Sequence, residues 1–329
     1  MNSKIITLIP AFRTDFLDSV FYGLSTQTYK NFRVIVADDS TNGIVSEYIR
    51  SGKYNEYTSK LDISILKGAG SEPRNHNLLL KAWDGNTELA HFHHDDDYLY
   101  PDFYRQHVIA HDNLDITLSA SSRWIADREG KPLAYSQTPL ELSQSNERYS
   151  ILKPNYLSTS LLISVRNWIG EFSNVVMSND ILKFLPSLPA IHEPYWGMQD
   201  MSLYLTNCKQ GNNFGYIRDH LSVYRSPIPG IAYRNPNTLI GKLIRFAWVA
   251  YTVQAWEDNM LSDEDFVTAL SNSLRAYAVS IPPDDMMNCL ADNISLANGN
   301  FHTIADHVNL AWSTLQSDYD CSCTEGPLR

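Results

Sequence analysis

Three adjacent carboxylates, Asp95, Asp96 and Asp97, are the residues of this sequence best suited to chemistry. They follow an apolar run, so a predicted strand would bring them together to one edge of a sheet. Neighbouring carboxylates repel one another, and such a group costs stability unless a cation or hydrogen-bond donors relieve it. Mn²⁺ and Mg²⁺ take oxygen ligands, often one or two carboxylates together with substrate phosphates. The triplet therefore indicates a divalent metal site, and the alternative is a solvated acidic loop.

Two further groups near this triplet could bind ligands. His91, His93 and His94 invite a zinc site, but no thiolate or third ligand follows at zinc-site spacing, and strand histidines are mostly buried core residues. Arg74 opens a predicted helix, where an arginine beside the first N–H groups suits an anion such as a diphosphate. The alternative for Arg74 is an ordinary surface ion pair with Glu72.

A second acidic motif lies later in the chain. Tyr195, Trp196 and Gly197 precede Asp200 at a predicted transition from loop to helix. Flat aromatic faces bind the apolar faces of sugar rings, and a carboxylate can remove the proton of a hydroxyl group. The stretch therefore suits a sugar pocket with Asp200 as a general base. In the alternative, Asp200 is a helix N-cap and Trp196 is a core residue.

An alternation of strands and helices must position these residues. The predicted elements, in order, are a strand at 5–9, a helix at 15–28, a strand at 32–37, a short helix ending at 50, a strand at 61–66, a helix at 73–83 and a strand at 89–93. This order implies an α/β fold with a mostly parallel sheet. Ligands bind beyond the carboxyl ends of such strands. We therefore expect Pro10–Arg13, Asp38–Asp39 and Asp95–Asp97 to meet at one edge.

The pattern is weaker from residue 116 to residue 226, and it is helical afterwards. Short strands are predicted at 116–120, 158–163 and 214–218, and a helix is predicted to begin near residue 197. Apolar residues at three- and four-residue spacing predict helices at 239–259, 263–279, 283–296 and 301–315. Pro227, Pro229 and Gly230 mark the boundary between the two regions.

Composition and charge exclude several classes of protein. The chain has 329 residues, 43% of them hydrophobic, which is ample for a packed core. The 26 basic and 37 acidic residues give a net charge of −11 without a basic run, so we expect no nucleic-acid partner. The apolar stretch at 239–256 contains Lys242 and Arg245 and does not predict a membrane span. The four cysteines form no disulfide or zinc pattern and fit a reducing cytoplasm.

The order and spacing of five motifs resemble the inverting glycosyltransferases of family 2, which have the GT-A fold. The first motif consists of the strand Ile5–Ile9 with Pro10-Ala11-Phe12 and of the later segment Gln27-Thr28-Tyr29. The other four are Val36-Ala37-Asp38-Asp39-Ser40, Arg74-Asn75, His94–Pro101 and Gln199-Asp200. In the family these segments carry Pro-x-Tyr-Asn, Gln-Thr-Tyr, Val-Asp-Asp-Gly-Ser, Ala-Arg-Asn, Asp-x-Asp with a following Leu-x-Pro, and a Glu-Asp pair. The resemblance covers about residues 3–226.

This resemblance implies a role for each matching residue. The implied nucleotide-binding residues are Pro10, Ala11, Arg13, Asp38, Asp39, Arg74 and Asp95. Asp39 would contact the base and Asp95 would approach the ribose. Asp96 and Asp97 are the implied ligands of Mn²⁺ or Mg²⁺, with Asp96 favoured. Asp200 would be the catalytic base, beside a sugar pocket formed by Tyr195, Trp196 and Gly197.

The implied reaction moves one sugar from a nucleoside diphosphate sugar, with a UDP-sugar favoured, to an acceptor hydroxyl in polysaccharide or glycoconjugate synthesis. The sequence departs from the family at Arg13, Gln199 and Pro227, where the family has Asn, an acidic residue and His. His220 is a candidate to replace that histidine. These departures leave open a non-catalytic sugar- or nucleotide-binding protein. A nucleotidyltransferase is less favoured, because the loop after the first strand is not glycine-rich.

The same resemblance suggests how the chain is divided. We predict a GT-A domain at 1–230, with a nucleotide-binding half at 1–110 and an acceptor-binding half at 111–230, and a helical region at 231–329. Processive members carry membrane helices and a Gln-x-x-Arg-Trp motif, neither of which we find. We therefore expect a soluble, cytoplasmic enzyme of single-sugar transfer, with peripheral membrane attachment as an option. The C-terminal helices are candidates for a homodimer contact.

Overall fold

The computed structural model describes residues 3–83, 85–135, 137–184, 198–225, 235, 238–281 and 285–323. The chain forms two compact units, and each is described by itself. The first consists of residues 1–154, 168–193 and 210–227, and the second of residues 155–167, 194–209 and 228–329. Tyr195, Trp196 and Gly197 lie outside the described residues, so the predicted sugar pocket stays a prediction.

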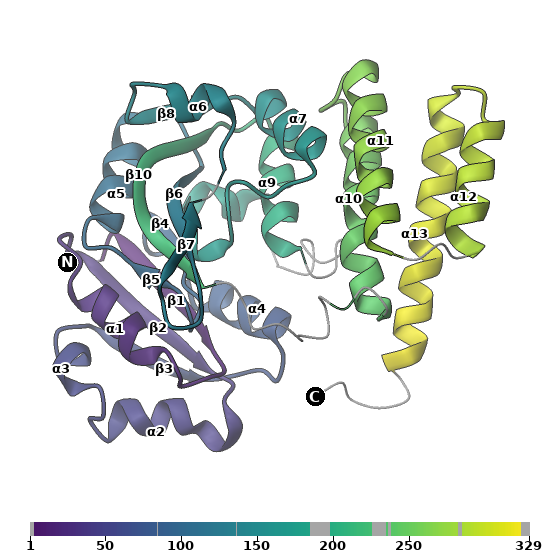
Figure 1. Cartoon of the computed structure of the whole chain (residues 1–329). Helices are drawn as coiled ribbons and strands as arrows, with labels where there is room; N and C mark the ends of the chain where they lie inside the picture. The colour runs from purple at the N-terminus through teal and green to yellow at the C-terminus, as the bar shows by residue number, and fades with distance from the viewer. Residues whose placement is uncertain are drawn as a thin grey trace. The chain divides into compact units, whose positions relative to one another are not determined.

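The first unit is built on one curled, mixed sheet (Figure 1). Its strands are β1 (Ile5–Ala11), β2 (Phe32–Asp38), β3 (Ile63–Lys67), β4 (Leu89–Phe92), β5 (Tyr98–Leu99), β6 (Leu118–Ala126), β7 (Pro132–Tyr135), β8 (Tyr149–Leu152), β9 (Val175–Ser178) and β10 (Phe214–Arg225). The main path runs β3-β2-β1-β4-β9-β6-β10-β5. The strands β1 to β4 are parallel, as the alternation predicts, whereas β9 is antiparallel to both β4 and β6.

Helices cover both faces of this sheet. They are α1 (Leu17–Ser25), α2 (Ile44–Arg50), α3 (Asn55–Thr58), α4 (Glu72–Trp83), α5 (Phe103–Asn113) and α6 (Leu140–Gln144), with short turns η1 (Thr41–Gly43), η2 (Phe172–Asn174) and η3 (Asn179–Lys183). Ile5 and Ile9 of β1 pack with Phe21 of α1 and with α5. On the opposite face, the ring of His76 in α4 contacts the ring of Phe92 edge-on. The alternation of side chains along β1 and β4 produces this two-sided core.

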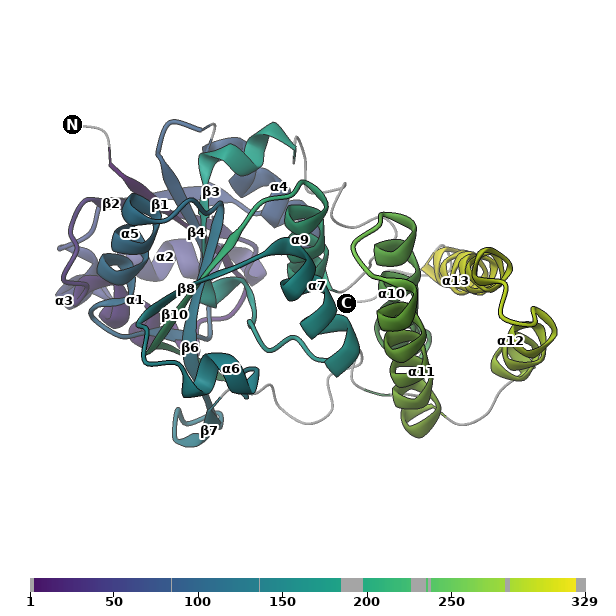
Figure 2. The same ribbon diagram turned by 90° about the horizontal axis from the view of Figure 1, so that it is seen from above.

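The second unit is helical. Its helices are α7 (Pro154–Ser164), α9 (Gln199–Lys209), α10 (Leu239–Glu257), α11 (Asp263–Ser280), α12 (Asp285–Leu296) and α13 (Phe301–Cys323), and Figure 2 shows α12 and α13 side by side, nearly end-on. Thr238 and Ser262 accept hydrogen bonds from the first-turn N–H groups of α10 and α11, which fixes where these helices begin. Phe246 packs against Tyr277 and Trp312 in the core. The predicted C-terminal helical extension is confirmed.

The predicted strand at 158–163 is wrong, because these residues lie in α7. The run contains Thr159 and Ile163 and looks strand-like by composition. Leu157 and Leu161 are buried at four-residue spacing, which suits one face of a helix. The Ser158 hydroxyl also donates to the carbonyl of Met260, which precedes α11. The helices α7 and α9 thus group with the C-terminal helices, and this unit begins earlier in the chain than residue 231.

Among the helices of the described residues, none combines the length and the apolar character needed to cross a bilayer.

Candidate functional site

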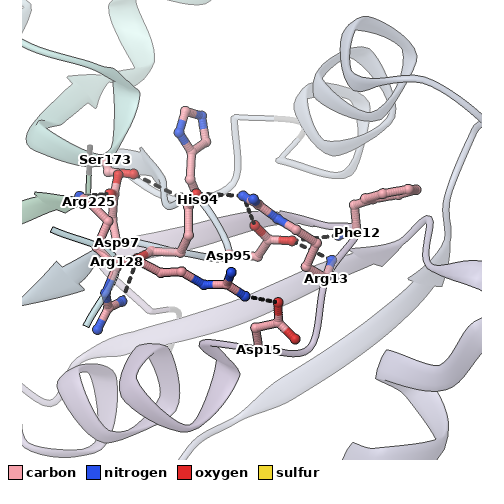
Figure 3. A network of polar contacts seen from close by, with 10 residues as sticks. Phe12, Arg13, Asp15, His94, Asp95, Asp97, Arg128, Ser173 and Arg225 are labelled. Carbon is pink, nitrogen blue, oxygen red and sulfur yellow. Dashed lines mark hydrogen bonds and ion pairs between the residues drawn. The ribbon is translucent and has the colours of Figure 1, made fainter. Parts of the chain in front are cut away.

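The loop that follows β1 is held by Asp95. Its Oδ2 accepts hydrogen bonds from the backbone N–H groups of Phe12 and Arg13, each at 2.7 Å (Figure 3). Burial raises the pKa of Asp95, and the hydrogen bond from the Arg13 backbone acts in the opposite direction. The structure thus brings together two of the segments predicted to meet, and Asp95 serves there as an anchor for the loop backbone.

Asp38 and Asp39 organise the neighbouring loop. The carboxylate of Asp38 accepts from the backbone N–H and the hydroxyl of both Ser40 and Ser46. Burial alone would raise the pKa of Asp38, but these hydrogen bonds outweigh burial and hold it below its ordinary value. Asp39 donates its N–H to the carbonyl of Ala11 and accepts from the N–H of Gly70, both at 2.8 Å. The ends of β1 and β2 are therefore linked, as predicted.

Substitution of Gly68 tests how tightly the backbone packs against the loop after β2. A Cβ at this position would lie 2.7 Å from the carbonyl oxygen of Asp38 and 2.7 Å from Cα of Asp39, both backbone atoms. We expect Gly68→Ala to cost about 1–3 kcal/mol of unfolding free energy, as overpacking does. Urea unfolding measures this, and Ser64→Ala on the exposed side of β3 is the control. Equal stability of the two variants would show that the loop can shift freely.

Arg13 forms an ion pair that the sequence did not reveal. Its Nη2 lies 2.5 Å from Oδ2 of Asp96 and 3.5 Å from Oδ1 of Asp95. The side chains of Arg13 and Asp96 are 38% and 21% exposed, so the pair lies at the border of the solvent. The only feature of the sequence that indicates this ion pair is electrostatic, because a nearby cation relieves the repulsion within a carboxylate triplet.

Asp97 is the most deeply buried member of the triplet. Its Oδ1 accepts from the backbone N–H of Arg225 at 3.1 Å, while its Oδ2 receives no hydrogen bond within the described part of the chain. Burial and the nearby charge of Asp96 raise the pKa of Asp97 to about 7, against the opposing effects of the His94 charge and of a hydrogen bond between the Ser173 hydroxyl and the Asp97 carboxylate. A buried carboxylate oxygen without a donor is costly, and a cation would relieve it.

His94 completes a candidate metal site with the two aspartates. One ligand atom from each of His94, Asp96 and Asp97 lies within 4.8 Å of the others. Nε2 of His94 is buried and has no hydrogen-bond partner among the described residues. Two carboxylates and one imidazole suit a divalent ion such as Mn²⁺, so the residues present fit the predicted metal. The sequence favours Asp96 as the metal ligand, but Oδ2 of Asp96 is paired with Arg13. The carboxylate oxygen without a hydrogen bond among the described residues is Oδ2 of Asp97.

The other histidines have different surroundings. His91 engages both ring nitrogens, one with the Tyr104 hydroxyl and one with the Ser173 carbonyl, each at 3.0 Å, which leaves none for zinc. Burial lowers the pKa of His91 to about 3. His220, the predicted substitute ligand, stacks on Trp124 with ring centroids 4.6 Å apart. Of the described histidines other than His94, only His76 belongs to a group with metal-ligand spacing, together with Glu72 and His94.

One arginine from a distant segment contacts the backbone of the triplet. Arg225, at the end of β10, donates Nη1 to the Asp96 carbonyl at 2.5 Å and Nη2 to the Ser19 hydroxyl at 3.3 Å. The strand β10 is longer than the predicted 214–218, and this extension delivers Arg225. Arg74, predicted to bind the nucleotide, lies exposed in the first turn of α4.

Asp200, the predicted base, lies in the first turn of α9 in the second unit. Its Oδ2 accepts from Nδ2 of Asn167 at 2.6 Å, and its Oδ1 accepts from the N–H of Met201 at 2.8 Å. A carboxylate in the first turn is favoured by the helix dipole, so this position also gives the residue a structural use. The catalytic role of Asp200 stays a prediction.

With this geometry established, comparison with known proteins defines the class of fold. No protein-family model and no curated protein sequence matches the chain. Solved structures do match, and glycosyltransferases are among them, so the chain has a fold that glycosyltransferases share.

Two of these structures are particularly informative. TarS of S. aureus, residues 1–349, superposes with a TM-score of 0.57 over 97% of this chain and 92% of its own, at 14% identity. The mannosyltransferase PcManGT of Pyrobaculum calidifontis, solved with GDP-Man and Mn²⁺, gives 0.52 over 95% and 87%, also at 14% identity. TarS has also been solved with UDP and with UDP-GlcNAc. At this identity the likeness establishes the fold alone.

Proposed function

We propose that the protein is a metal-dependent, inverting glycosyltransferase that uses a nucleoside diphosphate sugar. One observation carries the proposal: Asp97 has a buried oxygen that accepts no hydrogen bond from the described residues, and it lies in one group with His94 and Asp96. This group follows β4, beside the loops that end β1 and β2, on a fold shared with glycosyltransferases. A UDP-sugar is the favoured donor, since TarS binds UDP and UDP-GlcNAc.

The metal would be held by His94, Asp96 and Asp97, and Mn²⁺ is favoured because PcManGT was solved with it. When bound, the ion would neutralise charge on the leaving diphosphate. The remaining work falls to residues of this chain. Asp95 fixes the backbone of the loop after β1, and Asp39 and Arg74 are proposed to contact the nucleotide.

Asp200 is the proposed general base. Its carboxylate takes the proton of the acceptor hydroxyl, and the resulting oxygen attacks the anomeric carbon opposite the diphosphate. The bond between that carbon and the diphosphate oxygen breaks, and the diphosphate leaves with the electron pair. One displacement of this kind inverts the configuration. The acceptor is proposed to be a saccharide or glycoconjugate, and a homodimer through the C-terminal helices is proposed as well.

Thermal unfolding with UDP, GDP and CDP, with and without Mn²⁺, tests the donor site. We expect one diphosphate to stabilise the protein in a metal-dependent way, by about 2.7 kcal/mol at 100 times its dissociation constant. Asp97→Ala should remove the metal dependence, and the corresponding nucleoside monophosphate is the ligand control. Absence of stabilisation by any diphosphate would contradict the proposal.

Turnover separates an enzyme from a binding protein on the same scaffold. Hydrolysis of the matching nucleotide sugar, measured by release of the nucleoside diphosphate, should accompany binding and should require Asp200. Tight binding without release would instead support the non-catalytic alternative, which the departures at Gln199 and Pro227 leave open.

A further inference from the structure

We propose that Arg13 is an internal counterion that holds Asp96 in the ligand-free protein and transfers to the diphosphate when the donor binds. In this exchange Asp96 becomes available to the metal only as the guanidinium leaves, so metal and diphosphate bind together. This inference rests on the proposed function and assigns Arg13 as a positioning residue of that site.

The first argument is the difference between the backbone and the side chain of Arg13. The backbone N–H donates to Asp95, whose carboxylate also holds the N–H of Phe12, so the Cα of Arg13 is fixed. The guanidinium, in contrast, meets Asp96 at a half-exposed position, with 38% of the Arg13 side chain exposed. A side chain on an anchored backbone can exchange partners without any movement of the loop.

The second argument is competition for one carboxylate. Oδ2 of Asp96 is engaged by the guanidinium at 2.5 Å, while Oδ2 of Asp97 and Nε2 of His94 have no partner in the described parts of the chain. A metal ion entering alone therefore meets two free ligands and a third that is already neutralised. Two cations on one carboxylate repel each other, which weakens metal binding while Arg13 stays in place.

The third argument is the chemistry of the incoming ligand. A guanidinium forms paired hydrogen bonds with phosphate oxygens, and a diphosphate carries more charge than the single carboxylate it would replace. Transfer of the guanidinium from Asp96 to the diphosphate keeps the arginine paired and frees the carboxylate. Because coupling between two ligands is reciprocal, the diphosphate should strengthen metal binding by the factor with which the metal strengthens diphosphate binding.

Arg128 provides a matched control on the same side of the molecule. It pairs with Asp15 at 3.4 Å, and Figure 3 shows this pair beside the Arg13 network. Its partners among the described residues are Asp15 and the ring of Phe16, and none of them is an aspartate of the triplet. Arg128→Gln therefore removes the same charge from the same region and leaves Asp96 paired.

The test measures Mn²⁺ binding by electron paramagnetic resonance in the full-length protein, first without any nucleotide. We expect Arg13→Gln to bind Mn²⁺ on the order of 10-fold more tightly than the unaltered protein, within the usual range of coupling between sites. Arg128→Gln should change the affinity by less than about 3-fold, as exposed charges do. Adding UDP should strengthen Mn²⁺ binding more in the unaltered protein than in Arg13→Gln. The Mn²⁺ affinity of Arg13→Lys, which keeps the charge without the paired donors, should lie between those of the unaltered protein and Arg13→Gln.

Equal Mn²⁺ affinities for Arg13→Gln and Arg128→Gln would overturn the proposal, whether UDP binds or not. Equal effects of UDP on the unaltered protein and on Arg13→Gln would do the same. If the unaltered protein binds Mn²⁺ but no nucleoside diphosphate, the proposed function fails, and that result is visible before any variant is compared. Circular dichroism confirms that each variant is folded, and Arg13→Lys carries the test if Arg13→Gln is not.

Discussion

Asp97→Asn is expected to make the metal-free protein more stable at pH 8 and to abolish its stabilisation by Mn²⁺. In the folded chain the pKa of Asp97 is raised to about 7 by burial and by Asp96, while an unfolded aspartate titrates near pH 3.9. Between these values the folded state binds more protons than the unfolded state, so stability falls as the pH rises through this window. Above pH 7 the full cost of the buried charge is present, and the amide removes it.

The expected gain in unfolding free energy follows from the difference between the folded and unfolded pKa of Asp97. A difference of about three pKa units corresponds to roughly 4 kcal/mol as an upper bound, and we expect a gain of about 2–4 kcal/mol at pH 8. The gain should vanish below pH 4, where Asp97 is protonated in both states. Unfolding of both proteins at pH 4 and pH 8, in chelator and in Mn²⁺, measures it.

Asp96→Asn is the matched control for this prediction. Asp96 is adjacent in sequence, but it is partly exposed and paired with Arg13, so its removal should bring no comparable gain at pH 8. If Asp97→Asn lowered the stability equally at both pH values, Asp97 would be a structural hydrogen-bond acceptor for Arg225 rather than a ligand awaiting a cation.

Asp200→Asn is expected to reduce sugar transfer by about 10²–10⁴-fold, the usual contribution of a general base. The amide retains an acceptor oxygen for the hydrogen bond from Asn167 but cannot take a proton. Binding of the nucleoside diphosphate with Mn²⁺ should stay within about 3-fold of the unaltered protein. Steady-state rates and thermal shifts on the same preparations separate the two effects.

Two controls distinguish catalysis from support of the helix. Asn167→Ala removes one hydrogen-bond donor to Asp200 and keeps the Asp200 carboxylate, so a purely structural role predicts equal losses in Asn167→Ala and Asp200→Asn. Asp258→Asn removes a carboxylate that pairs with Lys209 at the other end of α9, and it should leave the rate unchanged. If the lower rate of Asp200→Asn were fully explained by a smaller folded fraction at the assay temperature, the catalytic role would be refuted.

The first part of the fold and the meeting of its loops could be predicted because both depend on local patterns. Apolar runs at 5–9, 32–37 and 89–93 predict parallel strands, and parallel strands end at one edge by geometry. The sequence therefore predicts that Asp95 lies near the loop after β1. In the structure, Asp95 accepts hydrogen bonds from the backbone N–H groups of Phe12 and Arg13 in that loop.

The features of the fold and of the site that the sequence does not predict depend on contacts between distant segments. Composition suggested a strand at 158–163, but burial of Leu157 and Leu161 and the bond from Ser158 to Met260 select a helix. Adjacency in sequence likewise cannot show that Asp97 accepts from the backbone of Arg225 while Asp96 is paired with Arg13, because both contacts join distant segments. The sequence groups His94 with His91 and His93 as a candidate zinc site, whereas in the structure the turn after β4 groups it with Asp96 and Asp97.

The position of Arg225 also has a consequence for biosynthesis. The hydrogen bond from its backbone to Asp97 spans 128 residues, and the one from its side chain to Ser19 spans 206. At ordinary rates of translation, roughly ten seconds pass between synthesis of the carboxylate triplet and synthesis of β10. During that interval the nascent chain can pair β1 to β4, while Asp97 lacks its backbone donor. The site that we propose for the metal is therefore completed late, and a nascent chain stalled before Arg225 should fail to bind Mn²⁺ tightly.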